Sequence, residues 1–210
     1  MPRGNFITFE GGEGSGKSTQ ISLLSDSLTK YGIVHIVTRE PGGTDLAEKI
    51  RPLLVKEQGN EDWDPRAETL LFLAARIQHW HHKIYPALEK GQWVLCDRFV
   101  DSTLVYQGVG KELGLSWVKD LHEQLLPDAL PDVTLLLDIE PQIGLSRAQK
   151  RHDDETRFES LTRAFHQSLR QGFSQLAAES DGRIKTIDAS NDIKTIENAI
   201  LEVIKERFSL

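Results

Sequence analysis

The chain has 210 residues, of which 39% are hydrophobic and 27% are charged, and its formal net charge is −7 at pH 7. This composition is too apolar for a disordered chain and too charged for a membrane span, and the length fits one domain. The negative charge argues against nucleic acid or a membrane as a partner. The single cysteine, Cys96, excludes an internal disulfide, and with an N-terminus that fits no signal peptide it indicates a cytoplasmic location.

Short β-rich runs alternate with longer helical patterns, which is typical of a parallel sheet with helices on both faces. The expected strands are residues 6–10, 34–38, 93–97, 133–138 and 184–188. One expected helix ends at residue 31, and the others span 45–56, 64–90 and 193–207 or begin at 141 and near 156. The pattern therefore predicts an α/β fold with a five-stranded parallel core, in a single domain over residues 1–210.

A glycine-rich segment follows the first expected strand directly and precedes an amphipathic helix. It fits the pattern G-x-x-x-x-G-K-[ST], in which backbone N–H groups bind phosphate, the lysine bridges the β- and γ-phosphates and the hydroxyl ligates Mg²⁺. The nucleotide-binding residues predicted here are Gly11, Gly12, Glu13, Gly14, Ser15, Gly16, Lys17, Ser18 and Thr19. GTPases, motor ATPases and small-molecule kinases all use such a loop, so it does not by itself name the function.

The third expected strand ends in Asp97, which Arg98 follows. Ligands of parallel sheets bind outside the carboxyl ends of the strands. We therefore expect Asp97 near the metal, with Ser18, and Arg98 in a position to hold a second anion. A helix cap is the alternative for Asp97.

A further set of candidates follows the second expected strand. Residues 39–44 form a tight turn rich in Pro and Gly, and Arg51 lies in the next expected helix. Phe72 and Arg76 are four residues apart and share a helical face. An aromatic ring beside a guanidinium suits a flat, hydrogen-bonding base, although core packing is the alternative for Phe72 taken alone.

Three histidines, His79, His81 and His82, lie close together in the long expected helix. His79 and His82 share a helical face, but no second pair of metal ligands lies at a suitable spacing. We therefore expect these histidines on a polar helix surface.

These segments in combination resemble the thymidylate kinase family. The resemblance rests on residues 9–18, 39–44, 72–76 and 97–108, and it runs through most of the chain. It implies a P-loop nucleoside-monophosphate-kinase-like three-layer fold. It also implies a homodimer that transfers the γ-phosphoryl group of ATP to dTMP, with Mg²⁺ as the metal.

The resemblance further implies a role for each residue on the acceptor side. Arg98 and Arg51 hold the dTMP phosphate, for which the planar guanidinium fork is suited. Phe72 stacks on thymine and Arg76 donates to a base carbonyl. The others are Tyr106, which crowds a 2′-hydroxyl, Glu13 on the sugar side, Glu40, which helps to place the acceptor and its metal or water, and Ser102, Thr103 and Gln107, which line the base and phosphate site.

The P-loop carries no arginine, whereas some family members have one there and others supply it from a mobile lid. We expect the lid at about residues 141–157, where Arg147 and Arg151 are four residues apart. Arg147 is expected at the nucleotide, and we hypothesise that Arg151 is the catalytic arginine, with Arg157 as a further candidate. A solvated charged face is the alternative for this run.

No strong general base is expected, because a phosphate monoester has its second pKa near about 6 and is largely dianionic at neutral pH. The expected catalytic set is Lys17, Arg98, Arg151 and Glu13, acting by positioning and charge stabilisation. Two alternatives stay open. One is a kinase for another nucleotide or a deoxynucleoside, and the other is a non-catalytic P-loop switch, which the lack of an N-K-x-D segment weakens.

Overall fold

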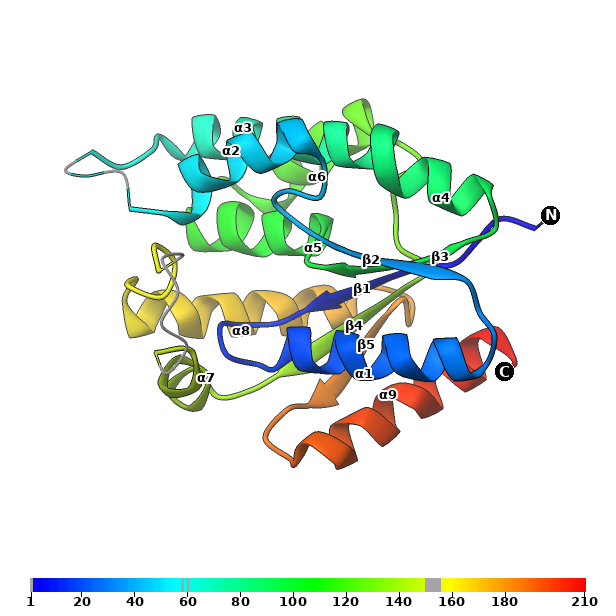
Figure 1. Cartoon of the computed structure of the whole chain (residues 1–210). Coiled ribbons are helices and arrows are strands. Elements are labelled where there is room, and N and C mark those ends of the chain that lie inside the picture. Colours follow the sequence, from blue (N-terminus) through cyan, green and yellow to red (C-terminus); the bar gives the residue numbers. More distant parts are fainter. Residues whose placement is uncertain (1, 58, 60, 150–155) are drawn as a thin grey trace.

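The computed structural model describes residues 2–57, 59, 61–149 and 156–210. Five parallel strands form one sheet in the order β2-β3-β1-β4-β5 (Figure 1). They are β1 (Phe6–Glu10), β2 (His35–Arg39), β3 (Trp93–Asp97), β4 (Val133–Asp138) and β5 (Ile184–Asp188). The predicted five-stranded parallel core is therefore confirmed, and only β2 differs, by one residue at each end.

Helices cover both faces of the sheet, as the predicted three-layer fold requires. One face carries α1 (Lys17–Lys30) and α9 (Ile193–Phe208), whose apolar residues pack against the sheet. The opposite face carries α3 (Pro65–His79), α4 (Tyr85–Glu89), α5 (Val100–Thr103), α6 (Leu115–Leu125) and α8 (Arg163–Ala178), with the π-helical turns η1 (Trp80–Ile84) and η2 (Leu104–Gly110). In addition, α2 (Asp45–Val55) packs on α3, and α7 (Pro141–Ala148) packs on α8.

The alternation of side chains along β1 connects the two layers of helices. Ile7 and Phe9 pack on the face with α1 and α9, whereas Phe6 packs on the opposite face, because successive side chains of a strand point to opposite sides. All of β1 is buried, since it lies in the middle of the sheet between β3 and β4. The loops that follow β1 and β3 therefore leave the sheet side by side at its carboxyl edge.

Two helical predictions differ from the structure. The helix expected near residue 156 begins at Arg163, where Oγ1 of Thr162 accepts a hydrogen bond from the Phe165 N–H at 3.2 Å, and residues 157–160 form turns instead. No helix is predicted from the sequence over α5, η2 and α6, all of which are helical in the structure. The helix predicted over 64–90 is present, and it runs through α3, η1 and α4.

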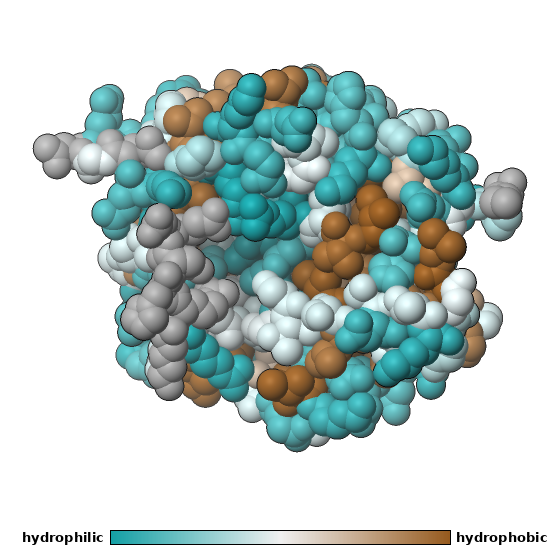
Figure 2. Space-filling model, viewed as in Figure 1, coloured by the Kyte–Doolittle hydropathy of each residue, from teal (hydrophilic) through white to brown (hydrophobic). Residues whose placement is uncertain are grey.

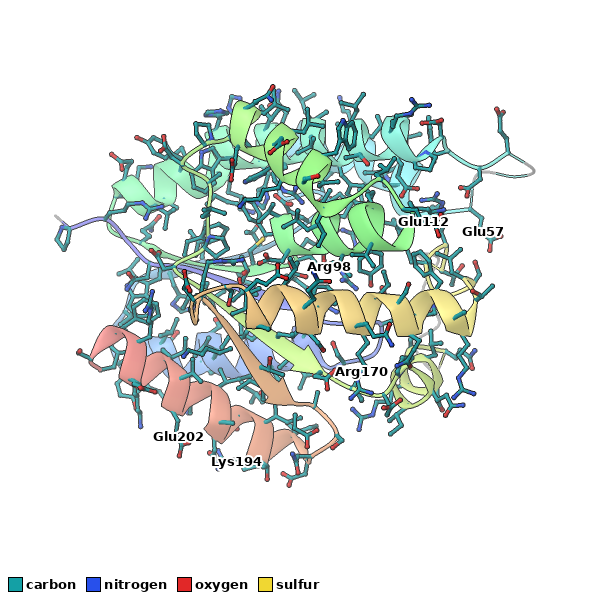
Figure 3. The ribbon with its side chains drawn as sticks, turned by 180° about the vertical axis from the view of Figure 1, so that it is seen from behind. Glu57, Arg98, Glu112, Arg170, Lys194 and Glu202 are labelled. Carbon is teal, nitrogen blue, oxygen red and sulfur yellow. The ribbon has the colours of Figure 1, made fainter. Side chains whose placement is uncertain are left out.

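Charged side chains gather on the outside of the fold. Figure 3 shows Lys194 and Glu202 projecting from α9, whereas Arg98 lies within the molecule. Over the described residues, no helix is long and apolar enough to cross a membrane.

Candidate active site

The glycine-rich loop joins β1 to α1 and encloses the side chain of Lys17. The Lys17 ammonium donates to the carbonyl oxygens of Gly11 and Gly12, each at 3.2 Å, and burial lowers the pKa of this group. Gly14 has φ of +66°, and a Cβ there would lie 1.9 Å from the carbonyl oxygen of Gly144, so a larger residue does not fit. The loop lies at the N-terminus of α1, which is the arrangement that binds phosphate.

Ser18 and Asp97 meet beside this loop. The hydroxyl of Ser18 donates to Oδ2 of Asp97 at 3.1 Å. Mg²⁺ takes oxygen ligands and is commonly held by one or two protein groups together with water and phosphate. No group of three or more His, Cys, Asp or Glu side chains in the described part of the chain could hold a metal by itself. The hydroxyl and carboxylate therefore fit an Mg²⁺ that is bound together with a nucleotide.

Arg98 connects the end of β3 to the P-loop. Its guanidinium donates to Oε1 of Glu13 at 2.7 Å, to the Gly11 carbonyl at 3.2 Å and to the Ser102 hydroxyl at 3.1 Å. Its backbone has φ of 67°, in the left-handed region that residues with a side chain rarely adopt. The backbone is therefore strained at the point where β3 leads into α5, and such strain is common at functional sites.

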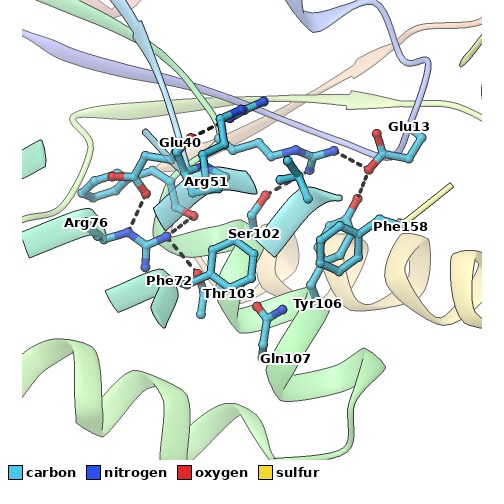
Figure 4. A pocket seen from close by; sticks show the side chains of 14 residues that line it. Glu13, Glu40, Arg51, Phe72, Arg76, Ser102, Thr103, Tyr106, Gln107 and Phe158 are labelled. Carbon is cyan, nitrogen blue, oxygen red and sulfur yellow. Dashed lines mark hydrogen bonds and ion pairs between the residues drawn. The ribbon is translucent and has the colours of Figure 1, made fainter. Parts of the chain in front are cut away.

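A cavity of about 110 Å³ lies between α2, α3 and η2 (Figure 4). The structure brings together in it all ten residues that the sequence predicts on the acceptor side. They are Glu13, Glu40, Arg51, Phe72, Arg76, Arg98, Ser102, Thr103, Tyr106 and Gln107.

A cleft of about 1060 Å³ runs along the P-loop, and Figure 2 shows it as a hydrophilic hollow. The predicted nucleotide residues that line it are Glu13, Gly14, Ser15, Gly16, Lys17, Ser18, Thr19 and Arg147, whereas Gly11 and Gly12 border a smaller cavity behind the loop. Four residues line both the cleft and the acceptor cavity, namely Glu13, Glu40, Arg51 and Arg98. The two spaces thus meet at a pair of arginines and a pair of carboxylates.

Arg76 lies in the wall of the cavity and is almost completely buried. Its Nε donates to Oε2 of Glu40 at 2.7 Å, and its Nη2 donates to the Phe99 carbonyl at 3.0 Å and to the Thr103 hydroxyl at 2.8 Å. Its Nη1 has no partner although it is buried. Because buried donors are normally paired, Nη1 is free to donate to a ligand.

His79 corrects the prediction of a polar surface. Its side chain is fully buried, with Nδ1 3.0 Å from Oε1 of Glu40 and Nε2 2.7 Å from the Thr38 hydroxyl. Burial alone would raise the pKa of Glu40, but Arg76 and His79 lower it below its usual value. His79 therefore holds an ionised Glu40 in place. The spacing of three residues between Arg76 and His79 is the sequence signal for this pairing.

Tyr106 and Phe158 form the aromatic side of the cavity. The hydroxyl of Tyr106 donates to Oε1 of Glu13 at 2.8 Å, and its ring lies 5.0 Å beneath the guanidinium carbon of Arg98. Phe158 contacts the Tyr106 ring edge-on, with 5.3 Å between centroids, and lies 6.3 Å from the ring of Phe72. Phe158 is not predicted from the sequence, because nothing in its local pattern sets it apart.

Glu10 is a second residue of the site that is not predicted from the sequence. Its buried carboxylate accepts hydrogen bonds from the Phe99 N–H at 2.8 Å, and from the N–H and hydroxyl of Ser102 at 3.1 and 2.6 Å. Burial, with a contribution from Asp101, raises the pKa of Glu10 to about 7. Glu10 thereby fixes the start of α5, and this places the Ser102 hydroxyl next to the guanidinium of Arg98.

The arginines expected in the lid have different positions. Arg147 lies on α7, lines the cleft and donates to the Ala189 carbonyl at 3.2 Å. Arg157 is buried outside the cavity and pairs with Asp62 and Glu68, so it is not exposed to a bound phosphate. Arg151 lies outside the described residues, and its role stays a prediction.

A P-loop at the end of a parallel strand, next to an acceptor cavity reached through two arginines, defines a nucleotide-dependent phosphotransferase. A sequence model of the thymidylate kinase family matches residues 9–200, and the chain belongs to this family. It is 47% identical over 206 residues to the thymidylate kinase of Magnetococcus marinus, covering 98% of each chain. It is 45% identical over 210 residues to that of Caulobacter vibrioides, covering all of both chains. The crystal structure of thymidylate kinase from Ehrlichia chaffeensis superposes with a TM-score of 0.77 at 34% identity, covering 97% of this chain and 99% of that one.

Proposed function

We propose that the protein phosphorylates dTMP to dTDP with Mg²⁺–ATP, at the junction of the cleft and the acceptor cavity. The observation that carries this proposal is that Glu13, Glu40, Arg51 and Arg98 line both spaces. Membership of the thymidylate kinase family makes dTMP the acceptor. A kinase for another acceptor or a non-catalytic switch is not favoured, because neither accounts for this family assignment.

The acceptor phosphate lies against Arg98 and Arg51 in this proposal, and ATP lies along the P-loop. An acceptor dianion is nucleophilic without a general base, so the chain has to overcome the repulsion between two anions. The guanidinium of Arg98 contacts Glu13 of the P-loop, and Lys17 lies buried beneath the same loop. Positive charge therefore flanks the point of transfer. Positioning and electrostatic stabilisation then supply most of the rate.

Mg²⁺ would be held by Ser18 and Asp97, and when bound it neutralises charge on the transferring phosphates. The short contact between the two side chains supports this pairing, because it brings two oxygen ligands to one point. Arg147 lies along the nucleotide in this arrangement, and Arg151 supplies the catalytic guanidinium, since the P-loop itself carries no arginine.

The base occupies the cavity, against the ring of Phe72. Arg76 donates through its unpartnered Nη1 to a base carbonyl. Tyr106 lies on the sugar side, where its ring leaves little room for a 2′-hydroxyl. Thr103 holds Arg76 in place and Ser102 holds Arg98, which gives each of these hydroxyls a positioning role.

We also propose that the protein forms a homodimer and functions in the cytoplasm. Leu46 and Leu53 on α2 and Leu70 on α3 are 53%, 40% and 52% exposed, and Figure 2 shows apolar atoms along the upper edge, over these helices. Burying such an apolar face in a symmetric contact would stabilise a dimer. Sedimentation of the protein as a monomer at micromolar concentration would contradict this part of the proposal.

A coupled assay of ADP release with Mg²⁺–ATP and a panel of acceptors tests the function. We expect strong turnover with dTMP, weaker turnover with dUMP and negligible turnover with UMP, dCMP, dGMP, AMP and thymidine. A preference for another acceptor would overturn the base and sugar roles. Nucleotide binding by folded protein, with no turnover on any acceptor, would leave the non-catalytic switch as the function.

A further inference from the structure

A fully buried carboxylate lies behind the acceptor cavity. Glu68 of α3 has no exposed surface and is not part of the cavity wall. Its Oε1 accepts a hydrogen bond from Nε2 of Gln107 at 2.8 Å, and its Oε2 accepts one from the guanidinium of Arg157. Of these three side chains, only Gln107 lines the cavity.

Arg157, which forms the ion pair with Glu68, is held in place by several further contacts. Its guanidinium also donates to the Leu54 carbonyl at 2.9 Å and to Oδ1 of Asp62 at 2.6 Å, and its backbone N–H donates to the Val55 carbonyl at 3.3 Å. Only 9% of its side chain is exposed. A guanidinium only donates, and a carboxylate in an ion pair with one offers both of its oxygens as acceptors.

The acceptor-only character of Glu68 determines how the Gln107 amide points. The NH₂ group of Gln107 must face Glu68, because the amide oxygen has no hydrogen to donate there. The carbonyl oxygen of Gln107 is therefore the atom left for a ligand in the cavity. Figure 4 shows this amide next to the ring of Phe72, on the opposite side of the cavity from Glu40.

We propose that Glu68 is a positioning residue for base selection, and that Arg157 and Glu68 together fix Gln107 with its carbonyl toward the base. The inference rests on the proposed function, which places the base in this cavity. Gln107 then accepts from a ring N–H, while Nη1 of Arg76 donates to a carbonyl. The edge of thymine, with a carbonyl beside a ring N–H, matches both groups. The edge of cytosine, with an amino group beside a bare ring nitrogen, opposes both.

The substitution Glu68→Gln replaces one carboxylate oxygen by an NH₂ group, and this reverses the direction of the hydrogen bond between residues 68 and 107. The introduced amide must turn its oxygen toward Arg157, which only donates, and so its NH₂ group faces Gln107. Gln107 must then turn its own oxygen toward residue 68, away from the cavity, and present its NH₂ group to the base. The variant is expected to fold, because Arg157 keeps its pairing with Asp62 and the Leu54 carbonyl.

The test compares kcat/KM for dTMP with that for 5-methyl-dCMP, which has the same methyl group and sugar but the cytosine edge. In Glu68→Gln we expect the preference for dTMP to fall at least about tenfold, while KM for ATP stays the same, since one oriented hydrogen bond is worth roughly this factor. In the double variant Glu68→Gln/Arg157→Gln, no guanidinium fixes the direction of the amides at positions 68 and 107. Its preference for dTMP is therefore expected to lie between those of the wild type and Glu68→Gln. Arg66→Gln, which removes an exposed ion pair on the same helix, is the matched control and is expected to match the wild type.

Two outcomes would overturn the proposal. An unchanged preference in Glu68→Gln, or an equal loss of both acceptors, would show that Glu68 does not set the polarity of the cavity. The variant Phe72→Ala distinguishes this from failure of the proposed function. A raised KM for dTMP in that variant supports the base site and leaves only the role of Glu68 at stake, whereas an unchanged KM removes the base from the cavity and overturns both.

Discussion

Nη2 of Arg98 lies 2.7 Å from Oε1 of Glu13, and this ion pair spans the point where the cleft and the acceptor cavity meet. Each partner comes from a loop at the carboxyl end of a neighbouring strand, β3 and β1. The same oxygen of Glu13 also accepts from the Tyr106 hydroxyl. One carboxylate thus orients both the arginine proposed to bind the acceptor phosphate and the ring proposed to lie on the sugar side.

Replacing Arg98 by lysine tests the need for the planar fork. Arg98→Lys keeps the positive charge but cannot contact two phosphate oxygens and Glu13 together, so we expect kcat/KM for dTMP to fall about 10²- to 10³-fold. Steady-state kinetics against dTMP at saturating ATP measures this. Arg170→Lys, which alters an ion pair with Asp138 outside the junction, should leave kcat/KM within a few-fold of wild type. Similar kinetics for the two variants would contradict the role of Arg98.

The site residues that can be predicted from the sequence are those that lie in contiguous motifs. The P-loop is one segment whose lysine and serine follow its glycines directly, and Asp97 and Arg98 follow a readable strand. Phe72 and Arg76 could be paired because helical spacing puts them on one face. Such local patterns carry both the residue types and their relative positions.

The residues that the sequence does not predict act through contacts between distant segments. The side chain of Arg157 donates a hydrogen bond to the Leu54 carbonyl, 103 positions away, and no sequence pattern in either segment indicates this contact. Residues 157–160, next to this contact, form turns where the sequence alone suggests a helix. His79 resembles a surface residue until Glu40 and Thr38, from a loop and a strand far along the chain, are placed against it.

Removing the arginine expected to act from the lid tests the central catalytic hypothesis. Arg151→Ala is expected to lower kcat about 10³-fold or more, because an arginine supplied to the transferring phosphoryl group contributes a factor of this size. Arg147→Ala, along the nucleotide, is expected mainly to raise KM for ATP. Single-turnover measurement of dTDP formation separates the two effects. A kcat for Arg151→Ala close to that of the wild type would rule out this residue as the catalytic arginine.

Two substitutions at Tyr106 separate its ring from its hydroxyl. Tyr106→Phe removes the hydrogen bond to Glu13 but keeps the ring, so we expect a loss of about tenfold in kcat/KM for dTMP with the preference for dUMP over UMP retained. Tyr106→Ala opens the sugar side, and the preference for dUMP should fall. Parallel assays with dUMP and UMP check both variants. A preference that survives in Tyr106→Ala would show that another group excludes the 2′-hydroxyl.

Glu10 predicts how stability depends on pH. Burial, followed by the charge of Asp101, raises the pKa of Glu10 from 4.5 to about 7 in the folded protein. Between these two values the folded state binds a proton that the unfolded state has released, so stability falls as pH rises. The contribution of Glu10 is therefore fully present below pH 4.5 and is lost as pH rises through about 7.

Thermal unfolding of the wild type and Glu10→Gln across this pH range measures the effect. The introduced amide does not titrate, so the difference in Tm between the two proteins should change between pH 4.5 and about 7 and become constant above that. The two proteins should differ at all pH values by an added offset, since an amide cannot accept all three hydrogen bonds from Phe99 and Ser102. A difference in Tm that does not vary with pH would show that Glu10 has an ordinary pKa. In that case the charge of Arg98 and the hydrogen bonds to this carboxylate would outweigh its burial.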